Sequence, residues 1–271
     1  KLNLALALDN TGSMASSGKM TALKSAAHNL LDTLKAAEKT PGDIKVSIIP
    51  FATDVNVGTG NVGASWIRWD KWEEKNGSWV GPKGSKVWTP DPHSEWNGCV
   101  NDRDQNYDTL ATATSGTATQ FPAHQPSSCP AAMMPLSTSW TDLHGKIDQM
   151  TPAGNTNVTI GLAWAWQTLA PVAPMNAPAD SPALDKVIIL LTDGENTQNR
   201  WSTSTYAIDA RTQKVCESVK AANIRLYTVR VIDGNADLLR NCATKSDMFY
   251  DVEQADELNV VFSAIAQNLS N

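Results

Sequence analysis

The chain has 271 residues, enough for one large α/β domain with an insertion, and its 41% hydrophobic and 18% charged residues are typical of an ordinary globular protein. The formal net charge of -6, with no basic stripe, argues against a nucleic-acid partner. No apolar run approaches the roughly 20 residues that span a bilayer.

The first half of the chain begins with a strand. A continuous apolar run over residues 2–8 predicts a strand that is buried on both faces. Apolar residues then recur at helical spacing over residues 20–34, and this helix ends before Pro41-Gly42. Residues 44–53 read as a second strand, and the stretch 51–58 is compatible with a short edge strand.

The second half repeats this alternation. Strands are predicted over residues 186–193 and 224–232, with a helix over residues 210–222 between them. A last helix places apolar residues between 258 and 269 on one face, and Asp256 is its predicted N-cap. The expected fold is therefore an α/β doubly wound, mainly parallel sheet with helices on both faces, which binds ligands outside the carboxyl ends of its strands.

Residues 60–138 interrupt the pattern, so the predicted domain comprises residues 1–59 and 139–271. The interruption is rich in Gly, Pro, Ser and Asp and holds six of the ten tryptophans. Because a structureless loop of this length is improbable, we expect a large irregular insertion with a small folded body of its own. The tryptophans are expected to fill its core rather than to form an exposed recognition cluster.

The four cysteines include no CxxC pair, and the four histidines are not at zinc-ligand spacing. This pattern is compatible with two disulfides in an oxidising compartment, or with four buried thiols. We predict that Cys99 pairs with Cys129 and that Cys216 pairs with Cys242.

Three segments carry oxygen donors to strand ends and loops. Asp9, Thr11 and Ser13 follow the first strand, Thr156 lies in a polar loop before a helix starting near Gly161, and Asp193 ends a later strand. Two carboxylates and three hydroxyls suit a hard divalent cation. Taken singly, each segment has a structural alternative: a helix cap for Asp9 or Ser13, a turn at Asp193-Gly194, and a backbone-bonded hydroxyl at Thr156.

These segments resemble the metal-ion-dependent adhesion site of von Willebrand factor type A domains, whose pattern is Asp-x-Ser-x-Ser, then Thr, then Asp. Thr11 stands where many members have Ser, and it keeps the hydroxyl. The stretches "LALDNTGSM", "WNGCVNDRDQNYD" and "GNTNVTIGLAWAWQTL" are similar to the TadG-like proteins of bacterial Tad/Flp pilus systems. That resemblance implies an extracytoplasmic domain, membrane-tethered in the full-length protein.

The resemblance implies a non-enzymatic, metal-dependent protein-binding or adhesion module. The cation is expected to be Mg²⁺, with Mn²⁺ or Ca²⁺ as alternatives, and its open position would take a carboxylate from a partner such as a pilus component or surface receptor. The alternative is a metal-dependent hydrolase that uses the same carboxylates. Ser16 and Lys19 have the Ser-x-x-Lys spacing of penicillin-binding proteins, but the partner motifs are missing and no histidine lies near the three segments.

Overall fold

The structure of the protein is a computed structural model that describes all 271 residues. Its centre is a sheet in which five strands run parallel, in the spatial order β12-β11-β10-β1-β2. These strands are β1 (Leu2–Asp9), β2 (Ile44–Phe51), β10 (Asp185–Thr192), β11 (Arg225–Val231) and β12 (Phe249–Val252). The predicted mainly parallel sheet is confirmed.

Three short strands extend the sheet beyond β2 through antiparallel pairings. Both β3 (Val55–Asn56) and β9 (Met134–Ser137) pair with β2, and β7 (Cys99–Val100) pairs with β3. The predicted short edge strand corresponds to β3. Because β7 and β9 come from the segment 60–138, this segment is joined to the main sheet by backbone hydrogen bonds.

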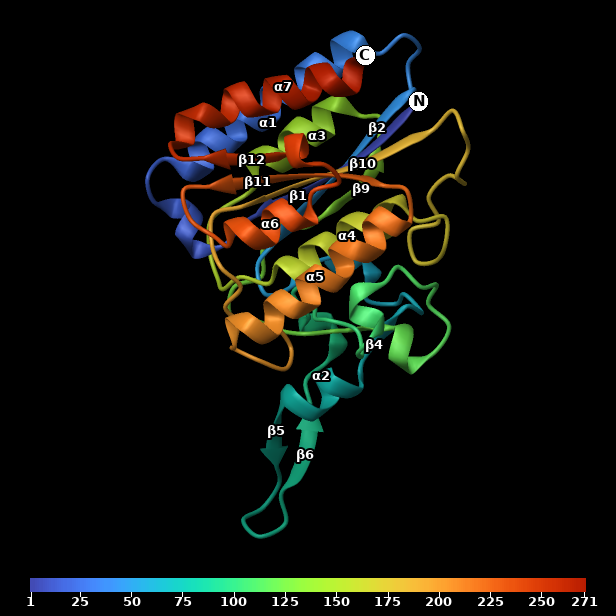
Figure 1. Cartoon of the computed structure of the whole chain (residues 1–271). Helices are drawn as coiled ribbons and strands as arrows, with labels where there is room; N and C mark the ends of the chain where they lie inside the picture. The colour runs from blue at the N-terminus through green and yellow to red at the C-terminus, as the bar shows by residue number, and fades with distance from the viewer.

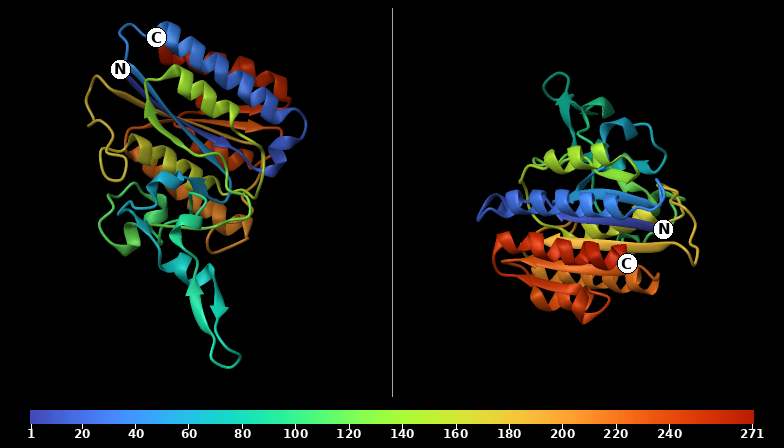
Figure 2. Two further views of the ribbon diagram at one scale, coloured as in Figure 1. Left: turned by 180° about the vertical axis from the view of Figure 1, so that it is seen from behind. Right: turned by 90° about the horizontal axis from the view of Figure 1, so that it is seen from above.

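Helices cover both faces of the sheet, as Figures 1 and 2 show. One face carries α1 (Lys19–Ala37), α3 (Trp140–Asp148) and α7 (Leu258–Ser270), and the other carries α4 (Val158–Leu169), α5 (Thr205–Ala221) and α6 (Ala236–Cys242). The side chains of β1 divide between the two faces because successive residues of a strand point in opposite directions. Its leucines pack under α1 and α7, while Ala5 and Ala7 pack under α4.

Three helix starts differ from the sequence predictions. Helix α5 begins at Thr205 rather than at Ala210, because the Ser204 side chain accepts a hydrogen bond from the Ala207 N–H (3.3 Å) and caps it there. Helix α4 begins at Val158 rather than near Gly161, because the Asn157 side chain accepts a hydrogen bond from the Ile160 N–H (3.4 Å) and caps it there. Asp256 does not cap α7. It lies in a 3₁₀ turn, Ala255–Glu257, and α7 begins at Leu258 with no side-chain cap.

Residues 60–138 include two small ribbons and one helix. Strands β4 (Ile67–Arg68) and β8 (Phe121–Pro122) form one ribbon, β5 (Gly77–Val80) and β6 (Val87–Pro90) form a hairpin, and α2 (Asp70–Lys75) lies between them in sequence. The β5–β6 hairpin projects away from the rest of the molecule (Figure 1).

The segment 60–138 does not have a core of its own, contrary to the sequence expectation. Trp72 and Trp96 are buried in the same apolar cluster as Ile49 of β2 and Val158 of α4. Four of the six tryptophans in the segment are partly or fully packed against this cluster, whereas Trp79 on the hairpin is 63% exposed. Most of the tryptophans therefore lie in or against a core that the segment shares with the domain.

Both predicted cysteine pairs are disulfide-bonded. Cys99–Cys129 closes a loop inside the segment 60–138, and Cys216–Cys242 joins α5 to α6 on one face of the sheet. No helix of the structure combines the length and the apolar character that crossing a bilayer requires.

Candidate metal centre

Two carboxylates lie side by side at the carboxyl edge of the sheet. Asp9 is the last residue of β1, and Asp193 directly follows β10, the neighbouring parallel strand. The Asp193 N–H lies 3.4 Å from Asp9 Oδ2, which places the two residues in direct contact. Both are 1% exposed or less, so strand pairing alone brings two buried acids together.

The loop after β1 is anchored to the loop that precedes α4. The Gly12 N–H donates to the Gly154 carbonyl (3.0 Å), and the Asn10 side chain donates to the Thr151 carbonyl (2.8 Å). The backbone carbonyl of Asn10 accepts a hydrogen bond from the Ala153 N–H (2.9 Å). These bonds hold two segments that are about 140 residues apart in sequence next to each other.

A chain of hydroxyl groups connects the two carboxylates. Thr11 Oγ1 donates to Asp9 Oδ1 (2.5 Å) and lies 3.1 Å from Ser13 Oγ, and Ser13 Oγ donates to Asp193 Oδ1 (2.8 Å). Four of the five residues singled out by the sequence therefore belong to one hydrogen-bonded cluster.

Thr156, the fifth residue, lies beside Gly194, as Ser13 does. A Cβ placed at Gly194 would be 3.7 Å from Ser13 Oγ and 4.0 Å from Thr156 Oγ1. The Thr156 N–H donates to the Thr197 hydroxyl (2.9 Å), which fixes the loop in this position. The structure thus brings all five predicted oxygen donors to the same edge of the sheet.

The electrostatics of Asp9 favour a bound cation. Burial and, to a smaller extent, the neighbouring Asp193 raise the pKa of the Asp9 carboxyl to about 7, although hydrogen bonds from Thr11 and Thr192 lower it. An ionised Asp9 is therefore costly unless a positive charge lies close to it. Carboxylate and hydroxyl oxygens are the donors that hard divalent cations prefer, so the residues present fit such an ion.

Lys19 supplies a positive charge that the sequence analysis did not assign to this site. Its ammonium group lies 2.8 Å from Asp193 Oδ2 and 3.7 Å from Asp233 Oδ2, and the residue is 3% exposed. A lysine at the start of a helix is disfavoured by the helix dipole. This position is explained by the ion pair with Asp193. In the sequence, Lys19 stands six residues after Ser13 and its spacing from Ser16 matches Ser-x-x-Lys, which does not point to an ion pair with Asp193.

Buried polar groups behind the oxygen donors support the start of α4. Asn157 Nδ2 donates to both carboxylate oxygens of Asp102 (3.1 Å each) and to the Thr53 carbonyl (3.2 Å). Asp102 also accepts a hydrogen bond from the Arg200 N–H (3.1 Å). Since Asp102 belongs to the segment 60–138, that segment helps to hold Asn157, which directly follows Thr156. Nothing in the sequence pattern marks Asp102 for this position.

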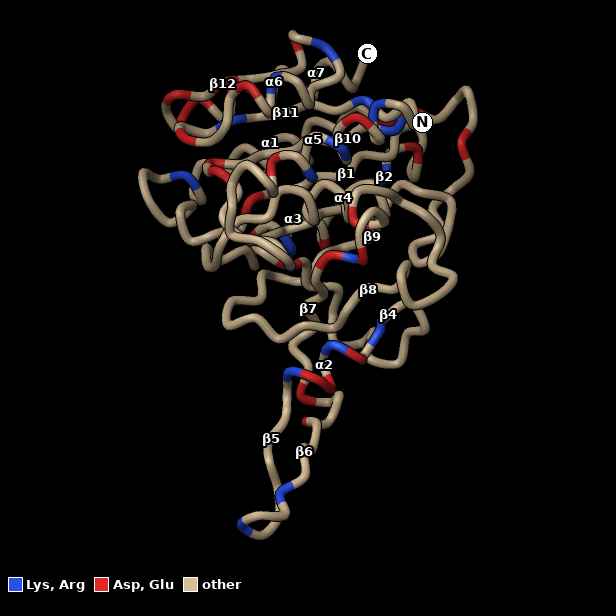
Figure 3. Tube along the Cα trace, turned by 60° about the horizontal axis from the view of Figure 1, so that its bottom comes forward, with Lys and Arg blue, Asp and Glu red and all other residues tan.

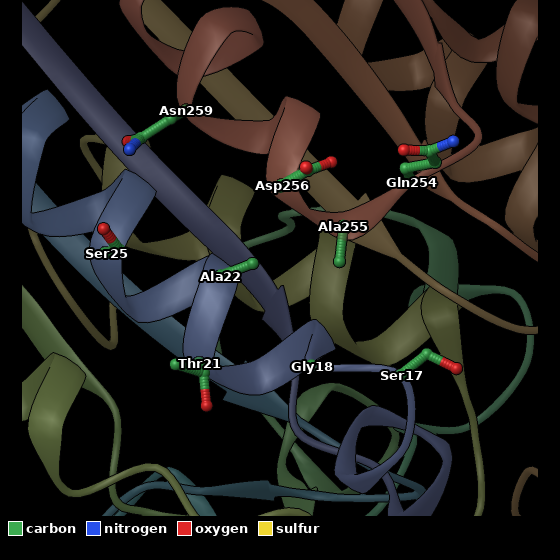
Figure 4. A pocket seen from close by; sticks show the side chains of 9 residues that line it. All are labelled: Ser17, Gly18, Thr21, Ala22, Ser25, Gln254, Ala255, Asp256 and Asn259. Carbon is green, nitrogen blue, oxygen red and sulfur yellow. The ribbon is translucent and has the colours of Figure 1, made fainter.

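A polar groove of about 620 Å³ lies beside the loop that carries Ser13. Figure 4 shows that it is formed by the start of α1 and by the segment that leads into α7. Its lining is made of hydroxyl, amide and small side chains with a single carboxylate, from Ser17, Gly18, Thr21, Ala22, Ser25, Gln254, Ala255, Asp256 and Asn259. The groove therefore offers hydrogen bonds to a partner and little charge.

A family model described as the von Willebrand factor type A domain matches residues 108–264, which is more than half of the chain. The match includes Thr156 and Asp193, and it does not extend to Asp9, Thr11 and Ser13. A search of curated proteins found no match.

Several solved structures share the fold. Proximal thread matrix protein 1 from the mussel byssus, also solved with a zinc-occupied MIDAS motif, gives a TM-score of 0.53 at 14% identity over 99% of this chain and 46% of that chain. The pilus adhesin SpaC from Lactobacillus rhamnosus GG gives a TM-score of 0.57 at 14% identity, over 99% of this chain and 30% of the SpaC chain. The vWF domain of the type V pili tip protein Mfa5 from Porphyromonas gingivalis gives a TM-score of 0.57 at 10% identity, over 99% of this chain and 94% of the Mfa5 domain.

This chain thus spans about half the length of the mussel protein and a smaller part of SpaC. At these identities the likeness concerns the fold alone.

Asp102 makes the stability of the fold depend on pH. Burial raises the pKa of its carboxyl to about 7, above the value of about 4 expected in the unfolded chain. The protonated acid therefore contributes stability below about pH 4, and this contribution is lost as the pH rises through about 7.

We expect Asp102→Asn to reduce the fall in unfolding free energy between about pH 5 and pH 8 by at least about 1 kcal/mol. Urea unfolding of both proteins in the presence of a chelator measures the difference. Asp237→Asn, at an exposed carboxyl, is the matched control and should keep the wild-type dependence. An Asp102→Asn protein with the wild-type slope would contradict this account.

Proposed function

Because the chain belongs to the von Willebrand factor type A domain family, we propose that it is a metal-dependent protein-binding module. The proposed metal ligands are Asp9, Thr11, Ser13, Thr156 and Asp193. The observation that carries the proposal is the pair of buried carboxylates, Asp9 and Asp193, joined through two hydroxyls at the carboxyl edge of the sheet. A cation at this position would add positive charge to that of the Lys19 ammonium group, which pairs with Asp193.

The proposed ion is Mg²⁺, with Mn²⁺ or Ca²⁺ as alternatives, because all five donors are oxygens. When bound, such an ion supplies a positively charged coordination position that a carboxylate from outside can take. Thr11, Ser13 and Thr156 are neutral donors and leave much of the ion's charge uncompensated. An acidic side chain of a partner protein is the ligand that this arrangement favours.

We place the module outside the cytoplasm, where its partner would be a pilus component or a surface receptor. Two disulfides support an oxidising compartment. Proteins of the same fold include pilus proteins, which agrees with the resemblance to Tad/Flp pilus proteins and with a membrane tether upstream of Lys1. The partner's identity rests on these resemblances, whereas the acidic character of the contact rests on the donor set.

The hairpin β5–β6 is the proposed second contact with the partner. Trp79, Val80 and Val87 are each more than half exposed on it, which is unusual for side chains of this size. Its charged residues are two lysines, Lys83 and Lys86, and Figure 3 shows this basic tip at the far end of the hairpin. Apolar and basic groups together suit a partner that also presents carboxylates. We infer that the insertion 60–138 thereby adds specificity to a domain formed by residues 1–59 and 139–271.

The proposal predicts a graded series of metal affinities. Asp9→Ala and Asp193→Ala should abolish binding of Mg²⁺ and Mn²⁺ in calorimetric titrations, because each removes one of two carboxylates. Thr11→Ser keeps the hydroxyl and should bind as wild type does, while Thr11→Val should bind at least about tenfold more weakly. Thermal melts should show that all four variants fold, since the core is formed by residues such as Leu4 and Ile189. Wild-type affinity in a folded Asp9→Ala protein would contradict the proposed site.

Lys19 should compete with the cation for Asp193. Lys19→Met removes a buried positive charge next to the ligands and should raise the affinity for Mn²⁺ by about tenfold or more. In the presence of a chelator the same variant should melt at a lower temperature, because Asp193 loses its ion pair. Lys35→Met, at an exposed lysine on the same helix, is the control for both measurements. A Lys19→Met protein with weaker Mn²⁺ binding would show that the ammonium group supports the site instead.

The exposed hairpin side chains should contribute little to folding. We expect Trp79→Ser with Val87→Ser to change the unfolding free energy by no more than about 1 kcal/mol. Trp72→Ala, at a buried tryptophan of the same segment, should cost about 3–5 kcal/mol. Urea unfolding of both proteins tests the contrast. A loss from the double variant as large as that from Trp72→Ala would assign the hairpin a structural role and remove the argument for a partner contact.

A further inference from the structure

Two histidines meet between α1 and α3, away from the proposed oxygen-donor site. His28 lies on α1 and His144 on α3, and each is followed four residues later by an aspartate, in the sequences "HNLLD" (28–32) and "HGKID" (144–148). The helices are antiparallel neighbours, because the earlier residue of α1, His28, contacts Asp148 at the end of α3, while the later residue, Asp32, contacts His144. His28 is nine residues from Lys19, roughly 14 Å along the helix, so this cluster is separate from the one around Asp193.

The four side chains form a continuous line of contacts across the two helices. His28 Nε2 lies 2.7 Å from Asp148 Oδ1, and His144 Nε2 lies 3.0 Å from Asp32 Oδ1. Between them, the Nδ1 atoms of the two rings are 2.6 Å apart. The ring planes differ by only 16°, and the ring centroids are 4.8 Å apart. With the two Nδ1 atoms only 2.6 Å apart, this centroid separation means that the rings meet at their edges and do not overlap face to face.

This arrangement assigns the protons on both rings. A carboxylate accepts hydrogen bonds, so each Nε2 carries the hydrogen and donates it to an aspartate. Each Nδ1 of a neutral ring then carries a lone pair in the ring plane. Two such lone pairs 2.6 Å apart repel each other unless a cation lies between them. The cation can be a shared proton or a metal ion.

We propose that His28 and His144 form a binding site for a transition-metal ion of the Cu²⁺, Zn²⁺ and Ni²⁺ class. Imidazole nitrogens select these ions over Mg²⁺ and Ca²⁺. The outer aspartates complete the carboxylate–histidine–metal pattern, in which a carboxylate fixes the ring and raises the basicity of the ligating nitrogen. The site does not depend on the proposed function, since it shares no residue with the oxygen-donor centre.

The surroundings of the two histidines allow an ion to enter. Metal–nitrogen distances are about 2.0–2.1 Å, so the two Nδ1 atoms must move apart to admit an ion. Both histidine side chains are 27% exposed, and the aspartates are more than half exposed. The rings can therefore rotate outward, and water can take the remaining coordination positions. With one ligand on each helix, the ion would clamp α3 onto α1 and stabilise the folded chain by mass action.

The test is a Cu²⁺ titration followed by electron paramagnetic resonance, in which hyperfine coupling to nitrogen distinguishes copper on the two histidines from copper at the oxygen-donor centre. The wild-type chain should bind one Cu²⁺ with hyperfine structure from two imidazole nitrogens. His28→Gln and His144→Gln should each bind at least tenfold more weakly, with at most one nitrogen. Asp148→Asn should lower the affinity about 10–100-fold while keeping both nitrogens.

His93→Gln is the matched control, because His93 also contacts a carboxylate, that of Glu73 at 3.1 Å, and has no second histidine beside it. It should bind Cu²⁺ as wild type does. Melting curves without metal should show that every variant folds, and Zn²⁺ should raise the melting temperature of the wild type but not of His144→Gln. A copper signal without nitrogen ligands, or one that persists in both His28→Gln and His144→Gln, would overturn the proposal.

Discussion

The confinement of two carboxylates to adjoining strand ends is the constraint on which the rest of the site depends. Asp9 and Asp193 are there because β1 and β10 are parallel neighbours in register, and helices on both faces of the sheet keep water away from them. Two buried like charges in contact raise the free energy of the fold unless hydrogen bonds or cations compensate them. The surrounding residues provide this compensation: hydroxyls from Thr11 and Ser13, and the ammonium group of Lys19.

Residues that are distant in sequence hold the loops around the two carboxylates in place. The loop after β1 keeps its shape through backbone bonds to residues 151–154, and Thr156 is held next to it by the cap of α4. Asp102 then ties that cap to the segment 60–138, which also shares its tryptophan core with the domain. The insertion therefore helps to position the loop that carries Thr156, while its hairpin is exposed and can contact a partner.

The sequence predicts four of the five parallel strands of the sheet, and it singles out the five oxygen-bearing residues that the structure brings to one edge of that sheet. Long apolar runs predict buried strands, and a carboxylate that directly follows such a run lies at the carboxyl edge of the sheet. The short elements α3, α6, β9 and β12 were not predicted, because tertiary packing decides segments of this length more than local periodicity does. Asp256 looked like a cap, but the chain makes a 3₁₀ turn there and α7 begins two residues later.

The residues that sequence reasoning missed share one physical feature, which is that their partners are distant in sequence. Lys19 pairs with a residue 174 positions away, and His28 meets one 116 positions away. Neither separation leaves a local pattern, and only the winding of α1 and α3 over the sheet brings these groups together. The "HNLLD" and "HGKID" stretches are similar to each other, yet each alone reads as an ordinary polar face of a helix.

The most direct test of the central claim is a crystal structure of the protein grown with Mn²⁺, with anomalous scattering recorded at the manganese edge. The account predicts one strong anomalous peak at the carboxyl edge of the sheet, with oxygen ligands among Asp9, Thr11, Ser13, Thr156 and Asp193, and a Lys19 ammonium group displaced from Asp193. Density showing Lys19 still paired with Asp193, and no anomalous peak at the strand ends at millimolar Mn²⁺, would contradict it.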